Sequence, residues 1–106
     1  MITFNMAKSM PRSEISTDFI QGMLDRMAMS YHKYGEVSIS FPDNCDALKS
    51  LDIRIQKYKE DGNLEWLMDA ANFAMIEFMC PSHKKAHFRA TDSSESPGRS
   101  YKEEDF

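Results

Sequence analysis

Apolar residues recur at spacings of three and four along the first third of the chain, which is the pattern of an amphipathic helix. The polar segment 16–18 precedes this stripe and offers helix caps, and Ser13 is an alternative cap. Gly35 follows the stripe, where a helix C-terminus is expected. We therefore predict a first helix over residues 14–34. Its apolar positions are Phe19, Ile20, Met23, Leu24, Met27 and Tyr31.

Two more helices are predicted farther along the chain. Apolar residues at helical spacing predict a helix over residues 45–60, with Asp43 or Asn44 as its cap. A tight-turn signal separates it from a third helix over residues 63–79. The third helix ends there because Pro81 disfavours helical backbone at the residue before it. The apolar positions of the second helix are Leu48, Leu51, Ile55 and Tyr58.

The remaining stretches favour extended backbone. Residues 36–41 alternate apolar and polar side chains, which is typical of a short strand. Ile2 and Phe4 form a second short stretch, with which the first could pair. A lone strand is marginal in water, so helices dominate the prediction. The predicted fold class is all-α, a small bundle of three main helices, with a short extended segment at 36–41 as the main alternative.

The third predicted helix is apolar around most of its circumference. Its polar residues are Glu65, Asp69, Asn72 and Glu77. A helix of this composition must be covered on most of its sides. Two partner helices leave part of it open, so we expect a homo-oligomer to complete the bundle. We predict a single helical domain over residues 1–92 and a flexible polar tail over residues 93–106.

Composition and charge narrow the class of protein. The chain has 106 residues, and its net charge of -4 disfavours a general nucleic-acid binder, which needs a basic surface. No stretch approaches the roughly 18 apolar residues of a membrane span, and the N-terminus lacks the apolar core of a signal peptide. Cys45 and Cys80 are too few for a disulfide framework. We therefore expect a cytoplasmic protein with reduced thiols and no membrane contact.

A polar stripe on the third helix is the first candidate site. Glu65, Asp69 and Asn72 fall within an arc of about 60° when residues advance by about 100° each. Carboxylate and amide oxygens are ligands that suit Mg²⁺ or Mn²⁺ and place substrate phosphates. The alternative is a plain solvated strip on an otherwise covered helix.

A basic cluster after the third helix is the second candidate site. Lys84, Lys85, His87 and Arg89 suit contact with an anion or a phosphate. A solvated surface segment is the alternative. His83 and His87 are four residues apart, as in zinc-binding HExxH motifs, but Lys84 stands where those motifs have glutamate.

The segment GNLEWLMDAANFAMIEFM, residues 62–79, resembles the last core helix of the all-α nucleoside triphosphate pyrophosphohydrolases, the MazG-like superfamily. The resemblance covers residues 48–79, and residues 33–35 (Lys-Tyr-Gly) are similar to an element of small phage-type relatives. It implies Mg²⁺-dependent cleavage between the α and β phosphates of a nucleotide. Asp69 would match the aspartate of the family's ExxD pair, with Glu65 near its glutamate, although these two residues are four apart and the second helix has no ExxE pair.

We therefore predict a small phage-type interaction protein on a MazG-like scaffold, which binds and modulates a larger host protein in the host cytoplasm. Nine methionines could provide an adaptable binding face for this role, or they could form a soft core. The alternative function is a Mg²⁺-dependent pyrophosphohydrolase, or a protein that sequesters a nucleotide without hydrolysis. In that alternative Glu65 and Asp69 hold the metal, Asn72 orients it, and Lys33 or Arg89 contacts phosphate.

Overall fold

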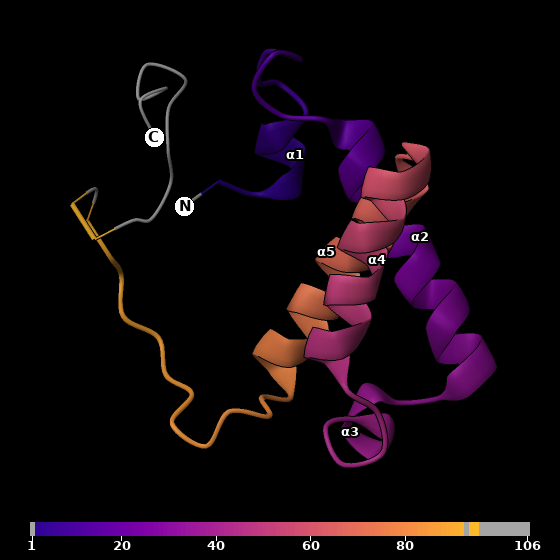
Figure 1. The fold of residues 1–106 in the computed structure, drawn as a ribbon. Helices are drawn as coiled ribbons and strands as arrows, with labels where there is room; N and C mark the ends of the chain where they lie inside the picture. Colours follow the sequence, from indigo (N-terminus) through magenta and orange to yellow (C-terminus); the bar gives the residue numbers. More distant parts are fainter. Residues whose placement is uncertain (1, 93, 96–106) are drawn as a thin grey trace.

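The computed structural model describes residues 2–92, 94 and 95, and this part of the chain is helical (Figure 1). Its helices are α1 (Phe4–Ala7), α2 (Thr17–Tyr34), α3 (Val37–Ser40), α4 (Ala47–Asp61) and α5 (Glu65–Met79). No strand occurs among the described residues. The predicted all-α fold class is therefore confirmed, and α2, α4 and α5 are the three main helices that the apolar patterns indicated.

Polar side chains set where the long helices begin. The Ser16 hydroxyl accepts a hydrogen bond of 3.0 Å from a backbone N–H in the first turn of α2. Asp46, rather than Asp43 or Asn44, caps α4 by accepting a bond of 2.9 Å. Asn63 accepts a bond of 3.0 Å from the first N–H of α5. Each long helix thus starts two or three residues later than predicted, because the pattern offered several adjacent caps.

Two glycines end helices with backbone that other residues adopt only at a cost. Gly35 follows α2 with φ 85° and ψ -162°, and Gly62 follows α4 in the left-handed region with φ 74° and ψ 10°. Each donates its N–H to a carbonyl in the last turn of its helix, at 2.8 Å. Gly35, expected as a helix stop, and Gly62, part of the expected turn between the second and third helices, therefore both act as C-terminal caps.

The segment predicted as extended is helical. Residues 36–41 contain the single helical turn α3, and the N-terminal stretch at Ile2 and Phe4 leads into the turn α1. A strand needs a partner to satisfy its backbone hydrogen bonds, and neither stretch provides one for the other. Phe41 instead packs near Phe73 of α5, with ring centroids 6.4 Å apart. The prediction of an extended segment was wrong for this reason.

α5 is the central helix, and α4 and α2 are the helices that pack closely against it within the described chain (Figure 1). α4 and α5 form a hairpin in which the Arg54 guanidinium lies 4.8 Å from the centre of the Phe73 ring. α2 approaches α5 closely at Gly22, where a Cβ atom would lie 2.6 Å from the sulfur of Met68. The small residue therefore sets the distance between these two helices.

The buried core of the described chain is small. Its buried residues are Ala7, Ala47, Ala70, Asn72 and Ile76. No large side chain in this part of the chain is completely enclosed. Several large apolar side chains in this part of the chain are more than half exposed, among them Met29, Leu64 and Phe78.

The segment after α5 runs away from the helices (Figure 1). Of the tail predicted over residues 93–106, only Ser94 and Glu95 belong to the described residues, and Glu95 forms an ion pair of 2.7 Å with Arg89. Within the described chain, no helix combines the length and the hydrophobicity that crossing a membrane requires.

The last residue of α4, Asp61, carries a carboxylate that links this helix to α5. Asp61 accepts a hydrogen bond of 3.0 Å from the indole N–H of Trp66 and one of 2.8 Å from the backbone N–H of Asn63. The bond from Trp66, and then that from Asn63, lower the pKa of Asp61 below its ordinary value of 3.8. The ionised carboxylate is therefore the form that the turn stabilises.

We expect this turn to loosen in acid. The folded-state pKa of Asp61 lies below its unfolded value, so its contribution is complete above pH 3.8 and is lost as the pH falls through the folded pKa. Trp66 is the only tryptophan, so its emission should change over this pH range. The Asp61→Asn variant should lack the transition, and an identical transition in that variant would contradict the assignment to Asp61.

Candidate functional site

The two acidic residues of the predicted stripe face α2, where an arginine binds both of them. Arg26 donates from Nε to Asp69 Oδ1 and from Nη1 to Glu65 Oε2, each at 2.6 Å. Residues four apart on a helix lie one above the other, so one guanidinium from a neighbouring helix reaches both carboxylates. The contact joins the middle of α2 to the first turn and a half of α5.

The electrostatics of this contact are those of a partly neutralised acidic pair. Asp69 is the more enclosed carboxylate, with 22% of its side chain exposed against 54% for Glu65. The hydrogen bond to Asp69, together with that to Glu65, raises the pKa of Arg26, so the guanidinium stays charged. A metal cation would have to compete with Arg26 for these carboxylates.

Asn72, the third residue of the predicted stripe, lies deeper in the same interface. It is 6% exposed, and its amide nitrogen donates a hydrogen bond of 3.1 Å to the backbone carbonyl of Met23 on α2. Its Oδ1 atom is buried without a partner among the described residues. Glu65, Asp69 and Asn72 thus all lie on the α2-facing side of α5, and Asn72 ties the backbones of the two helices together.

Sequence reasoning missed Arg26. One signal in the sequence could have identified Arg26: it is the only basic residue of α2 before the last turn of that helix. A lone cation on one helix and an acidic pair on another indicate an ion pair when the helices are neighbours. The sequence does not show which helices are neighbours, so the pairing emerges only in three dimensions.

The basic residues predicted to contact phosphate are not gathered at one place. Lys33 lies near the end of α2, with its Nζ 5.3 Å from the centre of the Tyr34 ring. Lys84, Lys85 and Arg89 lie in the exposed segment after α5, which runs away from that end of α2 (Figure 1). Arg89 is engaged by Glu95 through two hydrogen bonds.

The two histidines of the predicted HxxxH pair do not share a helix face, because α5 ends at Met79 and no helix follows in the described chain. His83 Nδ1 accepts a hydrogen bond of 3.0 Å from the backbone N–H of Lys85. The His87 Nδ1 atom lies 2.9 Å from the carbonyl oxygen of the same lysine. Within the described residues, no group of three His, Cys, Asp or Glu side chains could hold a metal ion.

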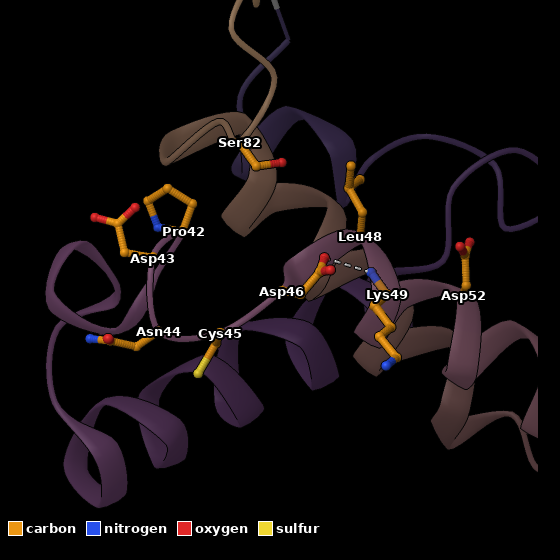
Figure 2. A pocket seen from close by; sticks show the side chains of 9 residues that line it. All are labelled: Pro42, Asp43, Asn44, Cys45, Asp46, Leu48, Lys49, Asp52 and Ser82. Carbon is orange, nitrogen blue, oxygen red and sulfur yellow. Dashed lines mark hydrogen bonds between the residues drawn. The ribbon is translucent and has the colours of Figure 1, made fainter.

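An open hollow of about 610 Å³ lies at the N-terminal end of α4 (Figure 2). Its lining combines three aspartates, Asp43, Asp46 and Asp52, with Lys49 and the exposed thiol of Cys45. Asp46 already serves as the helix cap. Acidic side chains near a helix N-terminus stabilise the helix, so these aspartates have a structural role in α4.

α2 carries an apolar stripe on the side turned away from α5. Its members, spaced by four, three, four and three residues, are Ile20, Leu24, Met27, Tyr31 and Tyr34. They span an arc of about 80°, and the centre of this arc lies about 140° from the α5-contacting residues Gly22 and Arg26. The exposed fractions of Leu24, Tyr31 and Tyr34 are 48%, 57% and 68%. This α2 stripe is therefore open along most of its length.

Two further features leave the α2 stripe accessible. α2 and α5 diverge toward their C-terminal ends (Figure 1). A shallow hollow of about 310 Å³ also lies beside Met27 and Tyr31, between the end of α2 and the start of α3. Two of the methionines, Met23 and Met68, are half-buried at the α2–α5 contact, whereas Met29 is 70% exposed and lies outside the α2 stripe.

Comparisons of the chain with models of protein families, with curated proteins and with solved structures found no match. The fold and the side chains described above define the class of protein: a small all-α bundle with an arginine-bridged acidic pair inside it and apolar helix faces on its surface.

Proposed function

We propose that this chain is a small helical interaction protein, which binds a larger protein along the α2 stripe and modulates it. The observation that carries the proposal is the exposure of Leu24, Tyr31 and Tyr34 in a stripe with coiled-coil spacing. An amphipathic helix of a partner packs well along such a stripe. Tyrosines suit this role, because their rings bury apolar area while their hydroxyls keep polar contacts.

The proposal includes the MazG-like scaffold and the phage-type origin suggested by the sequence, with a host protein as the partner and the cytoplasm as the compartment. The three main helices are compatible with an all-α scaffold of that kind. The free thiols of Cys45 and Cys80 are compatible with a reducing compartment. It also includes a homo-oligomer, which the exposed apolar side chains at the two ends of α5, Leu64 and Phe78, support.

The catalytic alternative requires Arg26 to move. In a Mg²⁺-dependent pyrophosphohydrolase, or in a nucleotide-sequestering protein, Glu65 and Asp69 would bind the cation that Arg26 now replaces. Two-metal phosphate chemistry normally gathers several carboxylates, and no third acidic side chain joins these two within the described chain. The α2 stripe needs no such rearrangement, so protein binding is the function that the geometry supports best.

The test places a photo-crosslinking amino acid at Tyr31 in the full chain and identifies what it captures in an extract of the cells that produce the protein. Affinity is then measured by calorimetry with the purified partner. Tyr31→Lys should weaken binding at least about tenfold, because it puts a charge into the contact. Met29→Lys is the matched control, since Met29 lies on α2 outside the stripe and is 70% exposed.

Equal losses of affinity in the two lysine variants would contradict binding along the α2 stripe. The catalytic alternative is tested with a panel of nucleoside triphosphates and Mg²⁺. Release of monophosphate and pyrophosphate, abolished in Asp69→Ala, together with no captured partner, would replace the proposal with the pyrophosphohydrolase function.

A further inference from the structure

α2 is the long helix that the rest of the described chain encloses least. None of its residues is buried, whereas α4 buries Ala47 and α5 buries three residues, among them Ile76. Among the long helices of this part of the chain, α2 packs closely against α5 alone. The hairpin of α4 and α5 therefore contains most of the buried core, and α2 lies beside that hairpin (Figure 1).

Two side chains make the hydrogen bonds that join α2 to α5 within the described residues. One is Arg26, which binds Glu65 and Asp69, and the other is Asn72, which binds the carbonyl of Met23. The side chain of Arg26 is 34% exposed and that of Glu65 is 54% exposed, so water and salt reach these ion pairs. Ion pairs with this exposure contribute little to stability. Added salt therefore weakens the contact that holds α2 in place.

Packing α2 against α5 also has an energetic cost at Asn72. The Oδ1 atom of this side chain is buried and accepts no hydrogen bond within the described residues. A buried acceptor without a partner is less stable than the same group in water. Water reaches this atom when α2 moves away from α5, so separation of the two helices removes this cost.

The connections at both ends of α2 allow the helix to move as a unit. Gly35 follows it, and a residue without a Cβ atom adopts many backbone conformations. A few residues later Phe41 packs near Phe73 of α5, so a hinge can lie only between Gly35 and Phe41. This stretch contains α3, a single turn of four residues. Before α2, residues 8–14 are all exposed and do not anchor it.

We propose that α2 is a lid, hinged between Gly35 and Phe41, which Arg26 holds shut against α5. Opening separates α2 from α5 while α4 and α5 stay packed together. It removes Arg26 from Glu65 and Asp69 and uncovers these two carboxylates, which is the rearrangement that the catalytic alternative requires. The proposal does not rest on partner binding along the α2 stripe, because that stripe lies on the other side of α2 and is exposed in both forms.

Hydrogen exchange of the full chain, measured by mass spectrometry under native conditions, tests the proposal. A free helix of the length of α2 is marginal in water, so its amides exchange whenever the lid opens. After correction for intrinsic rates, the amides of α2 should exchange at least about tenfold faster than those of α4 and α5. Sodium chloride at about 1 M should accelerate exchange in α2 at least about threefold, with a much smaller effect in the other two helices.

Two variants separate the ion pairs from general effects of charge. Arg26→Met should accelerate exchange in α2 at low salt and should abolish the response to salt, because the ion pairs no longer exist. Lys33→Met is the matched control. Lys33 is also a basic residue of α2, but it forms no ion pair within the described chain, so this variant should exchange like the unmodified protein.

A disulfide across the contact should hold the lid shut. A Cβ atom at position 22 would lie 3.8 Å from Cγ of Met68, so cysteines at these two positions are within reach of each other. In a chain with Cys45→Ser and Cys80→Ser, Gly22→Cys combined with Met68→Cys should slow exchange in α2 at least about tenfold when oxidised. Reduction of the same variant is the control and should restore the fast exchange.

Two results would overturn the lid. One is exchange that is equally slow in α2, α4 and α5, which would show that the three helices open only together. The other is fast exchange in α2 that responds neither to salt nor to Arg26→Met, which would show that Arg26 does not hold the helix in place. Both measurements are made on the protein alone, so the failure of partner binding along the α2 stripe would leave them unchanged.

Discussion

An Ile76→Ala variant is expected to lose about 2–4 kcal/mol of unfolding free energy. Ile76 is 4% exposed and is the one large apolar residue among the buried core positions of the described chain. Truncation removes three carbon atoms from a site that the surrounding helices cannot fully close. The loss is a large part of the stability of a domain this size, because small domains have only about 5–15 kcal/mol in total. Urea denaturation followed by circular dichroism at 222 nm measures it.

Ile53→Ala is the control for this prediction. Ile53 is an isoleucine in the middle of α4, but it is 42% exposed, so the same truncation should cost less than about 1 kcal/mol. The difference between the two losses of unfolding free energy measures the effect of burial, since both variants replace isoleucine with alanine. Equal losses would show that the core is not centred on Ile76.

An Arg26→Met variant is expected to lose about 1–3 kcal/mol of unfolding free energy. The substitution keeps much of the apolar stem but removes the guanidinium that binds Glu65 and Asp69. Two carboxylates one helical turn apart then repel each other without a counter-charge. Denaturation of the variant and of the unmodified protein, each at low and high salt, measures the loss and its electrostatic share.

The two acidic partners of Arg26 should contribute unequally to the free energy of unfolding. Asp69→Asn should destabilise the protein more than Glu65→Gln, because Asp69 is 22% exposed and Glu65 is 54% exposed, so water screens the second pair more strongly. A double-mutant cycle between Arg26→Met and Asp69→Asn measures their coupling directly. A coupling of zero, or a larger effect at Glu65, would contradict this account of the site.

Local patterns predicted most of the secondary structure. The periodicity of α2, α4 and α5 and the glycine stops at Gly35 and Gly62 act within a few residues of the chain, so they are visible in the sequence. The extended segment at 36–41 was the exception. Its alternation is the same local signal that a strand would give, but a strand forms only with a partner, and the chain folded its other candidate stretch into α1.

The sequence by itself determined the all-α class, the three main helices, and the acidic stripe of Glu65 and Asp69 on one side of α5. These features depend on spacing along one helix. Only the tertiary structure decided what these side chains meet. Arg26 lies 43 residues before Asp69, and their pairing depends on α2 crossing α5 at Gly22 and Arg26. Because the side of α2 that carries Gly22 and Arg26 faces α5, the α2 stripe on the opposite side of the helix faces outward.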